Sequence, residues 1–145
     1  MASLGDFAKR IRKLAKGIET NADQAVRRCA LAVDAAVVIA TPVDTGRARS
    51  NWQVELNQPA TSTRDPLDKS GAGAIAEGKR TIAQYKGGTP QASVHITNNL
   101  PYIAKLNDGH SAQAPAGFVE RAIMVGVEAV KDFSIVRTKG PTNDN

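Results

Sequence analysis

A long apolar periodicity at the start of the chain limits its folds more than any other feature of the sequence. Five apolar residues recur at steps of three and four, which places them on one stripe of a helix: Leu4, Phe7, Ile11, Leu14 and Ile18. The same periodicity continues to Ala40, and a new helix start is possible beside Gly17. Residues 4–40 are therefore expected to form one kinked helix or two helices in tandem.

This helical segment is expected to end at Thr41-Pro42. A proline ring disfavours helical geometry in the residue before it and removes a backbone donor. From Leu31 onward the helix is apolar on more than one side, through Leu31, Val33, Val37, Val38 and Ile39. The C-terminal end of the helix should therefore be buried in the centre of the fold or in a contact between subunits.

The rest of the chain predicts a small sheet and two shorter helices. Residues 51–56 and 92–97 alternate apolar and polar side chains, as half-buried strands do. Residues 57–70 predict a surface loop, 72–85 a short helix and 118–133 a final helix. The inward face of that final helix is expected to carry Val119, Ala122, Ile123, Val127 and Val130. The expected class is α+β, with the long N-terminal helix and the C-terminal helix packed on a small antiparallel β-sheet.

The length of 145 residues suits one domain with its own hydrophobic core. We expect this domain to span residues 1–133, followed by a polar tail at 134–145. Cys29 is the single cysteine, which excludes an intramolecular disulfide and a cysteine-cluster metal site. No stretch approaches the roughly 20 apolar residues that span a bilayer, so we expect synthesis in the cytoplasm and no membrane partner.

The charge pattern leaves two interpretations open. Nineteen Lys and Arg residues against fourteen Asp and Glu residues give a net charge of +5, which is common in proteins that work beside nucleic acid. Four basic residues lie on the first helix opposite its apolar stripe: Lys9, Arg12, Lys13 and Lys16. This basic face is either a solvated surface or a surface that contacts DNA phosphates.

Neither of the two patterns that could indicate catalysis or metal binding is complete. Residues 73–79 have the glycine and lysine spacing of a phosphate-binding loop, but Arg80 stands where that loop needs Ser or Thr for magnesium, and the preceding residues predict no strand. His95 and His110 do not stand at metal-ligand spacing from a Cys or from each other. We therefore expect no enzyme activity, cofactor or metal.

Two segments are harder to explain as ordinary packing, namely residues 41–52, after the long helix, and residues 98–119, before the last helix. In the first, Asp44 can accept hydrogen bonds from the turn, Gly46 can take a left-handed conformation, and Arg47 can pair with a carboxylate or a carbonyl end. In the second, prolines stiffen the chain and glycines permit close backbone approach. The candidate subunit-contact residues are Asp44, Thr45, Gly46, Arg47, Tyr102, Gly109, His110, Ser111, Gln113, Pro115 and Gly117.

Taken together, these segments resemble the phage neck and tail-completion family that includes the minor tail protein Z of lambda-like phages. That family has a helix, a Pro-Val-Asp-Thr-Gly-Arg turn and a strand. A return strand ending in Asn follows, then Pro-Tyr, a Gly-(His)-Ser-x-Gln-Ala-Pro segment and a last helix. The resemblance spans about residues 36 to 127, although residues 58–88 carry no family motif.

The resemblance implies an α+β fold and a structural role in the virion, without catalysis. The expected function is a neck or tail-completion subunit that joins head to tail, as a ring around the DNA channel. Its expected partners are further copies of the chain, portal or connector proteins and tail proteins, with at most weak contact to DNA. The alternative is a small basic DNA-binding protein that acts as a monomer or dimer.

Overall fold

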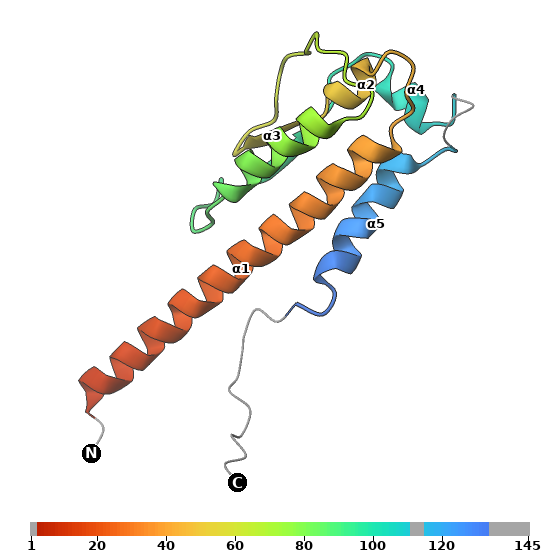
Figure 1. The fold of residues 1–145 in the computed structure, drawn as a ribbon. Coiled ribbons are helices and arrows are strands. Elements are labelled where there is room, and N and C mark those ends of the chain that lie inside the picture. Colours follow the sequence, from red (N-terminus) through yellow and green to blue (C-terminus); the bar gives the residue numbers. More distant parts are fainter. Residues whose placement is uncertain (1–2, 111–114, 134–145) are drawn as a thin grey trace.

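The computed structural model describes residues 3–110 and 115–133, and its longest element is the helix α1 (Leu4–Ala40) of 37 residues (Figure 1). Ser3 begins this helix with a capping box: its hydroxyl accepts from the Asp6 amide at 3.2 Å, and the Asp6 carboxylate accepts from the Ser3 amide at 3.1 Å. Of the two arrangements left open for residues 4–40, one helix or two in tandem, the structure has one helix, because α1 continues through Gly17 without a break. Its end at Thr41 is confirmed.

Within the described residues, two strands and four further helices follow α1. They are α2 (Arg47–Ser50), β1 (Gln53–Leu56), α3 (Ala72–Ala83), β2 (Val94–Thr97), α4 (Ile103–Asn107) and α5 (Phe118–Val130). In the described part of the chain, β1 and β2 form a two-stranded antiparallel sheet, in which Val54 pairs with Ile96. The predicted α+β class, with its long N-terminal helix, C-terminal helix and small sheet, is confirmed.

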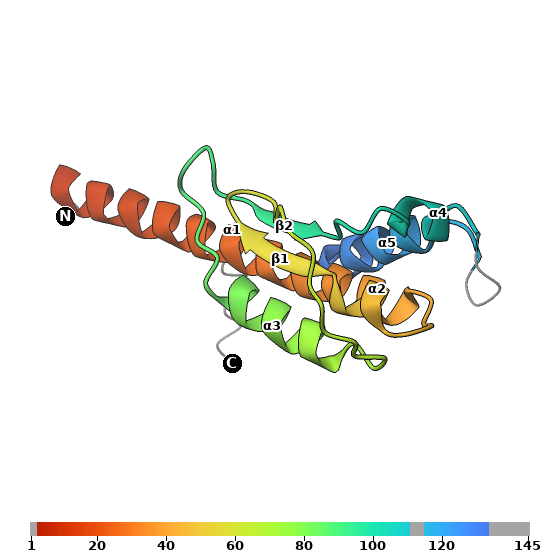
Figure 2. The same ribbon diagram turned by 90° about the horizontal axis from the view of Figure 1, so that it is seen from above.

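The C-terminal half of α1 is the centre of the molecule. In Figure 1 α3 and α5 lie on opposite sides of α1, and in Figure 2, seen from above, β1 and β2 lie over α1. One group of buried residues joins α1 to α3, α5 and the segment before β1: Val37, Val38, Trp52, Ala74, Phe118 and Ala122. A second group joins α1 to the sheet and the end of α3: Ala30, Val54 and Ile82. The apolar C-terminal part of α1 is thus buried on two sides, as expected, although Leu31 and Ile39 are exposed.

Helix α5 runs antiparallel to α1 and approaches it through small residues. Its start, at Phe118, is buried near Val37 and Val38, whereas Phe133, beyond its end, stacks under Arg28 at 5.9 Å. Gly126 lies so close to α1 that a methyl group there would overlap the Val33 side chain. A small residue at the contact allows the backbones of two helices to approach each other closely and to pack along their length.

The predicted inward face of α5 is partly wrong. Ala122 is buried, but Ile123 and Val127 are 49% and 50% exposed. The buried side is instead formed by Phe118, Ala122 and Gly126. The prediction placed the contact face of α5 on its apolar side chains. The face that packs on α1 is instead the one that carries Gly126, which is turned about one residue around the helix axis.

The N-terminal part of α1 projects beyond the body of the molecule (Figures 1 and 2). Its apolar stripe is exposed, with Leu4 at 88% and Phe7 at 61% of their full accessible surface. The predicted basic residues Lys9, Arg12, Lys13 and Lys16 are exposed as well. We call residues 4–18 the N-terminal arm.

A carboxyl group, that of Asp34, lies buried where α1 faces α3 and β1. The residue is 2% exposed, and its Oδ1 atom has no hydrogen-bond partner among the described residues. Gly78 of α3 makes room for this carboxyl, because a methyl group at Gly78 would overlap Asp34 Oδ2. Burial removes water from the charged form and raises the pKa of Asp34 from 3.8 to about 7.

Asp34→Asn is expected to remove a pH dependence from the stability of the fold. The folded state holds the Asp34 proton more tightly than the unfolded state, so the free energy of unfolding falls as pH rises from 3.8 to about 7. The fall is about 1.4 kcal/mol for each unit of pKa shift. Chemical denaturation across this pH range measures it, with the exposed Asp108→Asn as control. A wild type and an Asp34 variant that respond identically to pH would contradict the assignment.

Candidate subunit-contact site

The two motif segments meet in one hollow, although they are about 60 residues apart in the sequence. The first segment contributes residues 42–48 to its wall, and the second contributes Tyr102, Leu106 and His110. The hollow has a volume of about 240 Å³. It lies where α2 and α4 gather beyond the C-terminal end of α1 (Figure 1). We call it the loop hollow.

The loop hollow brings together six of the eleven candidate residues: Asp44, Thr45, Gly46, Arg47, Tyr102 and His110. Asp44, Thr45, Arg47, Tyr102 and His110 are all exposed. Gly109 precedes His110, while Pro115 and Gly117 lie further along, before α5. Ser111 and Gln113 fall outside the described residues.

The wall formed by residues 42–48 has a fixed shape because of Gly46. This residue has a φ of +90°, which confirms the predicted left-handed conformation. A Cβ atom there would lie 2.6 Å from the carbonyl carbon of Asp68, so a larger residue would collide with backbone. The Arg47 amide donates to Thr45 Oγ1 at 3.3 Å and closes the turn that leads into α2. A side chain at Gly46 would therefore deform the hollow.

The arginine that holds carbonyl groups is Arg49 and not the expected Arg47. Arg49 donates to the carbonyl of Thr41 at 3.0 Å, to that of Ile39 at 2.7 Å and to that of Lys69 at 2.9 Å. The last turn of α1 has no basic residue, so Arg49 supplies the positive charge that a helix C-terminus favours. In the sequence, the lack of a basic residue in the last turn of α1 was the signal that a basic side chain from elsewhere would contact this helix end. Arg47 stays exposed at the loop hollow.

Buried polar side chains fix the first segment to the rest of the fold. Trp52 Nε1 donates to Thr41 Oγ1 at 2.8 Å, and this hydroxyl donates to the Val37 carbonyl at 2.6 Å. Asn98, after β2, donates to the Ala48 carbonyl at 2.9 Å. The turn after α1 is thus bonded both to the helix it follows and to the return strand.

The second segment is fixed to α5 by backbone contacts at its glycines. Gly109 and Gly117 both have positive φ, at +93° and +82°, and the Gly117 amide donates to the Asn107 carbonyl at 2.7 Å. Asn107 Oδ1 accepts from the Val119 amide at 2.9 Å, so one asparagine joins α4 to the start of α5. The expected close backbone approach is confirmed at Gly109, where a Cβ atom would lie 3.4 Å from the Ala116 amide nitrogen, whereas at Gly117 the positive φ is what favours glycine. The part played by Asn107 was missed, because a single asparagine carries no pattern.

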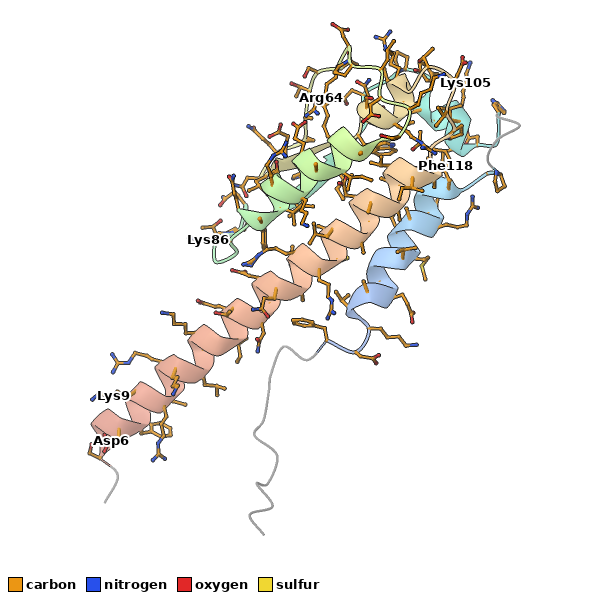
Figure 3. The ribbon with its side chains drawn as sticks, in the orientation of Figure 1. Asp6, Lys9, Arg64, Lys86, Lys105 and Phe118 are labelled. Carbon is orange, nitrogen blue, oxygen red and sulfur yellow. The ribbon has the colours of Figure 1, made fainter. Side chains whose placement is uncertain are left out.

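The surface loop 57–70 is confirmed as a segment without helix or strand, and side-chain amides hold its path. Asn51 accepts from the Arg64 amide at 2.6 Å and donates to the Arg64 carbonyl at 3.0 Å. The Arg64 guanidinium pairs with both oxygens of Glu77 on α3, at 2.5 and 2.6 Å. Figure 3 labels Arg64 beside α3. These hydrogen bonds and the Arg64–Glu77 ion pair fix the path of the 57–70 loop, whose conformation the sequence did not predict.

Residues 73–79, which have the glycine and lysine spacing of a phosphate-binding loop, lie in α3. The carboxylate of Asp68 lies at the start of that helix. Asp68 Oδ2 accepts from the Gly73 amide at 3.1 Å, and Oδ1 accepts from Ser70 Oγ at 2.6 Å. These hydrogen bonds, that from the Ser70 hydroxyl foremost, lower the pKa of Asp68. The helix follows a loop, and not a strand as a true phosphate loop does. Residues 73–79 lie inside α3 and form no loop around a phosphate, while Asp68 caps the start of the helix.

The fold defines a small α+β domain whose two motif segments meet at one end of a long helix. Residues 5–109 match the model of a family described as "Bacteriophage HK97-gp10, putative tail-component". Because this match covers most of the chain, the protein belongs to the HK97-gp10-like family of phage tail components. No curated protein and no solved structure gives a significant match. The narrower likeness to the minor tail protein Z stays a prediction from the motifs.

None of the helices in residues 3–110 and 115–133 combines the length and the hydropathy needed to cross a membrane.

Arg49→Met is expected to destabilise the fold by about 3 kcal/mol, since hydrogen bonds from a charged group contribute about 1.5–3 kcal/mol each and are not additive. Arg47→Met is the matched control, because it removes an exposed guanidinium two residues away. Its free energy of unfolding should stay within about 0.5 kcal/mol of the wild type. Urea denaturation of both variants tests the pair, and equal losses would show that Arg49 does not hold the end of α1.

Proposed function

We propose that this tail component is a neck or tail-completion subunit that joins the phage head to the tail as a ring around the DNA channel. Its place of action is the virion, after synthesis in the host cytoplasm. The observation that carries this proposal is the loop hollow, in which the two family motif segments expose Asp44, Arg47, Tyr102 and His110 on a fixed backbone. The role is structural, without catalysis.

The construction of the loop hollow supports a role in assembly. A ring repeats one head-to-tail contact by rotation, so an error in the angle of that contact accumulates and prevents closure. Gly46, Arg49 and Asn98 fix the first segment to α1, the 57–70 loop and β2. Asn107 fixes the second segment to α5. The exposed side chains are therefore held at set positions, as a contact of defined angle requires.

The chemistry of the loop hollow indicates a neighbouring protein as the ligand. Its wall carries an acidic residue, a basic residue, an aromatic ring and an imidazole, namely Asp44, Arg47, Tyr102 and His110. Tyrosine and arginine are enriched among the residues that contribute most to protein–protein affinity. A neighbouring copy, a portal or connector protein, or a tail protein can present polar and apolar groups to such a wall.

Arg47→Glu is expected to yield folded subunits that fail to enter particles, because it reverses the charge at the loop hollow without removing a described hydrogen bond of the side chain. Gln113→Arg alters the second segment at a position outside the described residues. It is expected to have the same effect, namely folded subunits that fail to enter particles. Immunoblots and electron microscopy of purified particles measure incorporation, and circular dichroism measures folding.

Lys79→Ala is the control for both variants, since Lys79 is exposed on α3 and outside the loop hollow. Its particles should be normal. Normal assembly by Arg47→Glu and Gln113→Arg would reject the site. ATP or GTP hydrolysis by the wild type that is lost in Lys79→Ala would reject the non-catalytic role itself.

The alternative, a small DNA-binding protein, is favoured by the exposed basic face of the arm at Lys9, Arg12, Lys13 and Lys16. Figure 3 shows Lys9 near the free end of α1, away from the rest of the chain. For the structural subunit we expect weak, sequence-independent affinity for duplex DNA. The logarithm of the binding constant should fall with the logarithm of salt concentration, by about 0.9 for each phosphate contacted. Fluorescence anisotropy across a salt series measures this slope, and tight binding to one sequence would favour the alternative.

A further inference from the structure

A hollow beside the middle of α1 gathers two arginines. Gln24, Arg27, Arg28, Leu31 and Phe133 line it, and its volume is about 440 Å³. Four of these residues belong to α1, and the fifth follows the end of α5 (Figure 1). None of the described lining residues is acidic. A hollow lined by charge of one sign attracts ions of the opposite sign. We call it the arginine hollow.

The charge of Arg27 is not compensated within the described chain. Its Nη1 atom is shielded from solvent and has no hydrogen-bond partner among the described residues. The ion pairs of the described residues are Arg64–Glu77 and Lys131–Glu128, so Arg27 belongs to neither. A shielded donor without an acceptor costs free energy, and a charged donor costs more. An oxyanion bound to this guanidinium group supplies the missing negative charge.

Arg28 is held at the arginine hollow by an aromatic ring. Its guanidinium carbon lies over the Phe133 ring, 5.9 Å from the ring centre. This stacking uses the face of the guanidinium group, whereas the N–H donors lie around its edge. Gln24, which is exposed on the same hollow, adds an amide donor. The donors suit phosphate oxygens, which arginine binds through two parallel hydrogen bonds.

The arginine hollow continues the basic face of the N-terminal arm. Steps of three and four residues connect the two along one side of α1. We call this the basic side of α1, and its residues are Lys9, Lys13, Lys16, Thr20, Gln24, Arg27 and Arg28. It extends over about 28 Å at 1.5 Å per residue. Five of its seven residues are basic and none is acidic.

The acidic residues in this part of α1 lie on another side of the helix. Glu19 and Asp23 line a separate hollow together with Tyr85 and Gly87. Asp23 accepts there from the Gly87 amide at 3.0 Å. The basic side of α1 between Lys9 and Arg28 therefore carries charge of one sign.

We propose that the arginine hollow binds a phosphate of the DNA backbone and that duplex DNA lies along the basic side of α1. Duplex DNA carries one negative charge for about every 1.7 Å of its axis, so phosphates are present along the whole length of this side. A protein partner would need a run of carboxylates of equal length. Phosphate contacts carry no direct sequence information. This inference rests on the proposed place of the subunit around the DNA channel, and it names the surface that meets the DNA.

Fluorescence anisotropy of a labelled mixed-sequence duplex, titrated with the full chain across a salt series, tests the proposal. The plot of the logarithm of the binding constant against that of salt concentration should lose about 0.9 of its slope in Arg28→Gln and about 1.8 in Arg27→Gln/Arg28→Gln, which lack one and two phosphate contacts. Arg80→Gln is the matched control, since it removes the same charge from an exposed position on α3. Its slope should equal that of the wild type.

Three results would overturn the proposal. The first is a double variant with the wild-type slope, and the second is an equal loss of slope in Arg28→Gln and Arg80→Gln, which would show that net charge alone matters. The third is displacement of the duplex by polyglutamate at a lower charge concentration than by unlabelled duplex, which would assign the hollow to an acidic protein segment. Circular dichroism checks folding. Arg28→Gln alters an exposed side chain, so it carries the test alone if the double variant unfolds.

Particle incorporation separates this inference from the proposed function. If the double variant keeps the wild-type slope and enters particles like the wild type, the phosphate site is wrong while the structural role stands. If its slope falls as expected and the wild type is absent from purified particles, the phosphate site is supported and the proposed function is wrong.

Discussion

The guanidinium group of Arg49 connects three parts of the chain at the C-terminal end of α1. It donates to carbonyls at the end of α1, in the residue that follows it and near the start of α3. The Ile39 and Thr41 carbonyls lie at the C-terminal end of a helix, where carbonyls lack an intrahelical partner, and Arg49 supplies that partner. One charged side chain therefore lets the chain turn sharply while its backbone stays bonded. The position of the 42–48 wall follows from this contact.

The turn also explains how the core and the loop hollow depend on each other. Thr41 accepts from the Trp52 indole at 2.8 Å, and Trp52 packs in the same buried group as Val37, Val38 and Phe118. Phe118 begins α5, whose preceding backbone is bonded to α4 through Asn107. Both walls of the hollow are thus attached to one hydrophobic core. Packing on this core holds the two walls in their relative position.

The molecule divides its surfaces between the two ends of α1. The loop hollow lies at one end, on a backbone held by buried polar contacts, and its exposed side chains are mostly polar. The arm lies at the other end, with an uncovered apolar stripe on one side and basic residues on the opposite side. Membership of a phage tail-component family agrees with a domain that meets several neighbours at once.

Sequence alone determined the elements whose causes are local: the 3.6-residue periodicity of α1, its end before Pro42, the two alternating strands and the left-handed turn at Gly46. Tertiary structure decided what lies against each element. Gly126, and not Ile123 or Val127, faces α1, because the absence of a side chain permits the close approach that apolar periodicity does not register. Arg49 rather than Arg47 reaches the carbonyls, and amide contacts set the path of residues 57–70. Local patterns specify a backbone, whereas the choice of buried face depends on which partners the rest of the chain brings near.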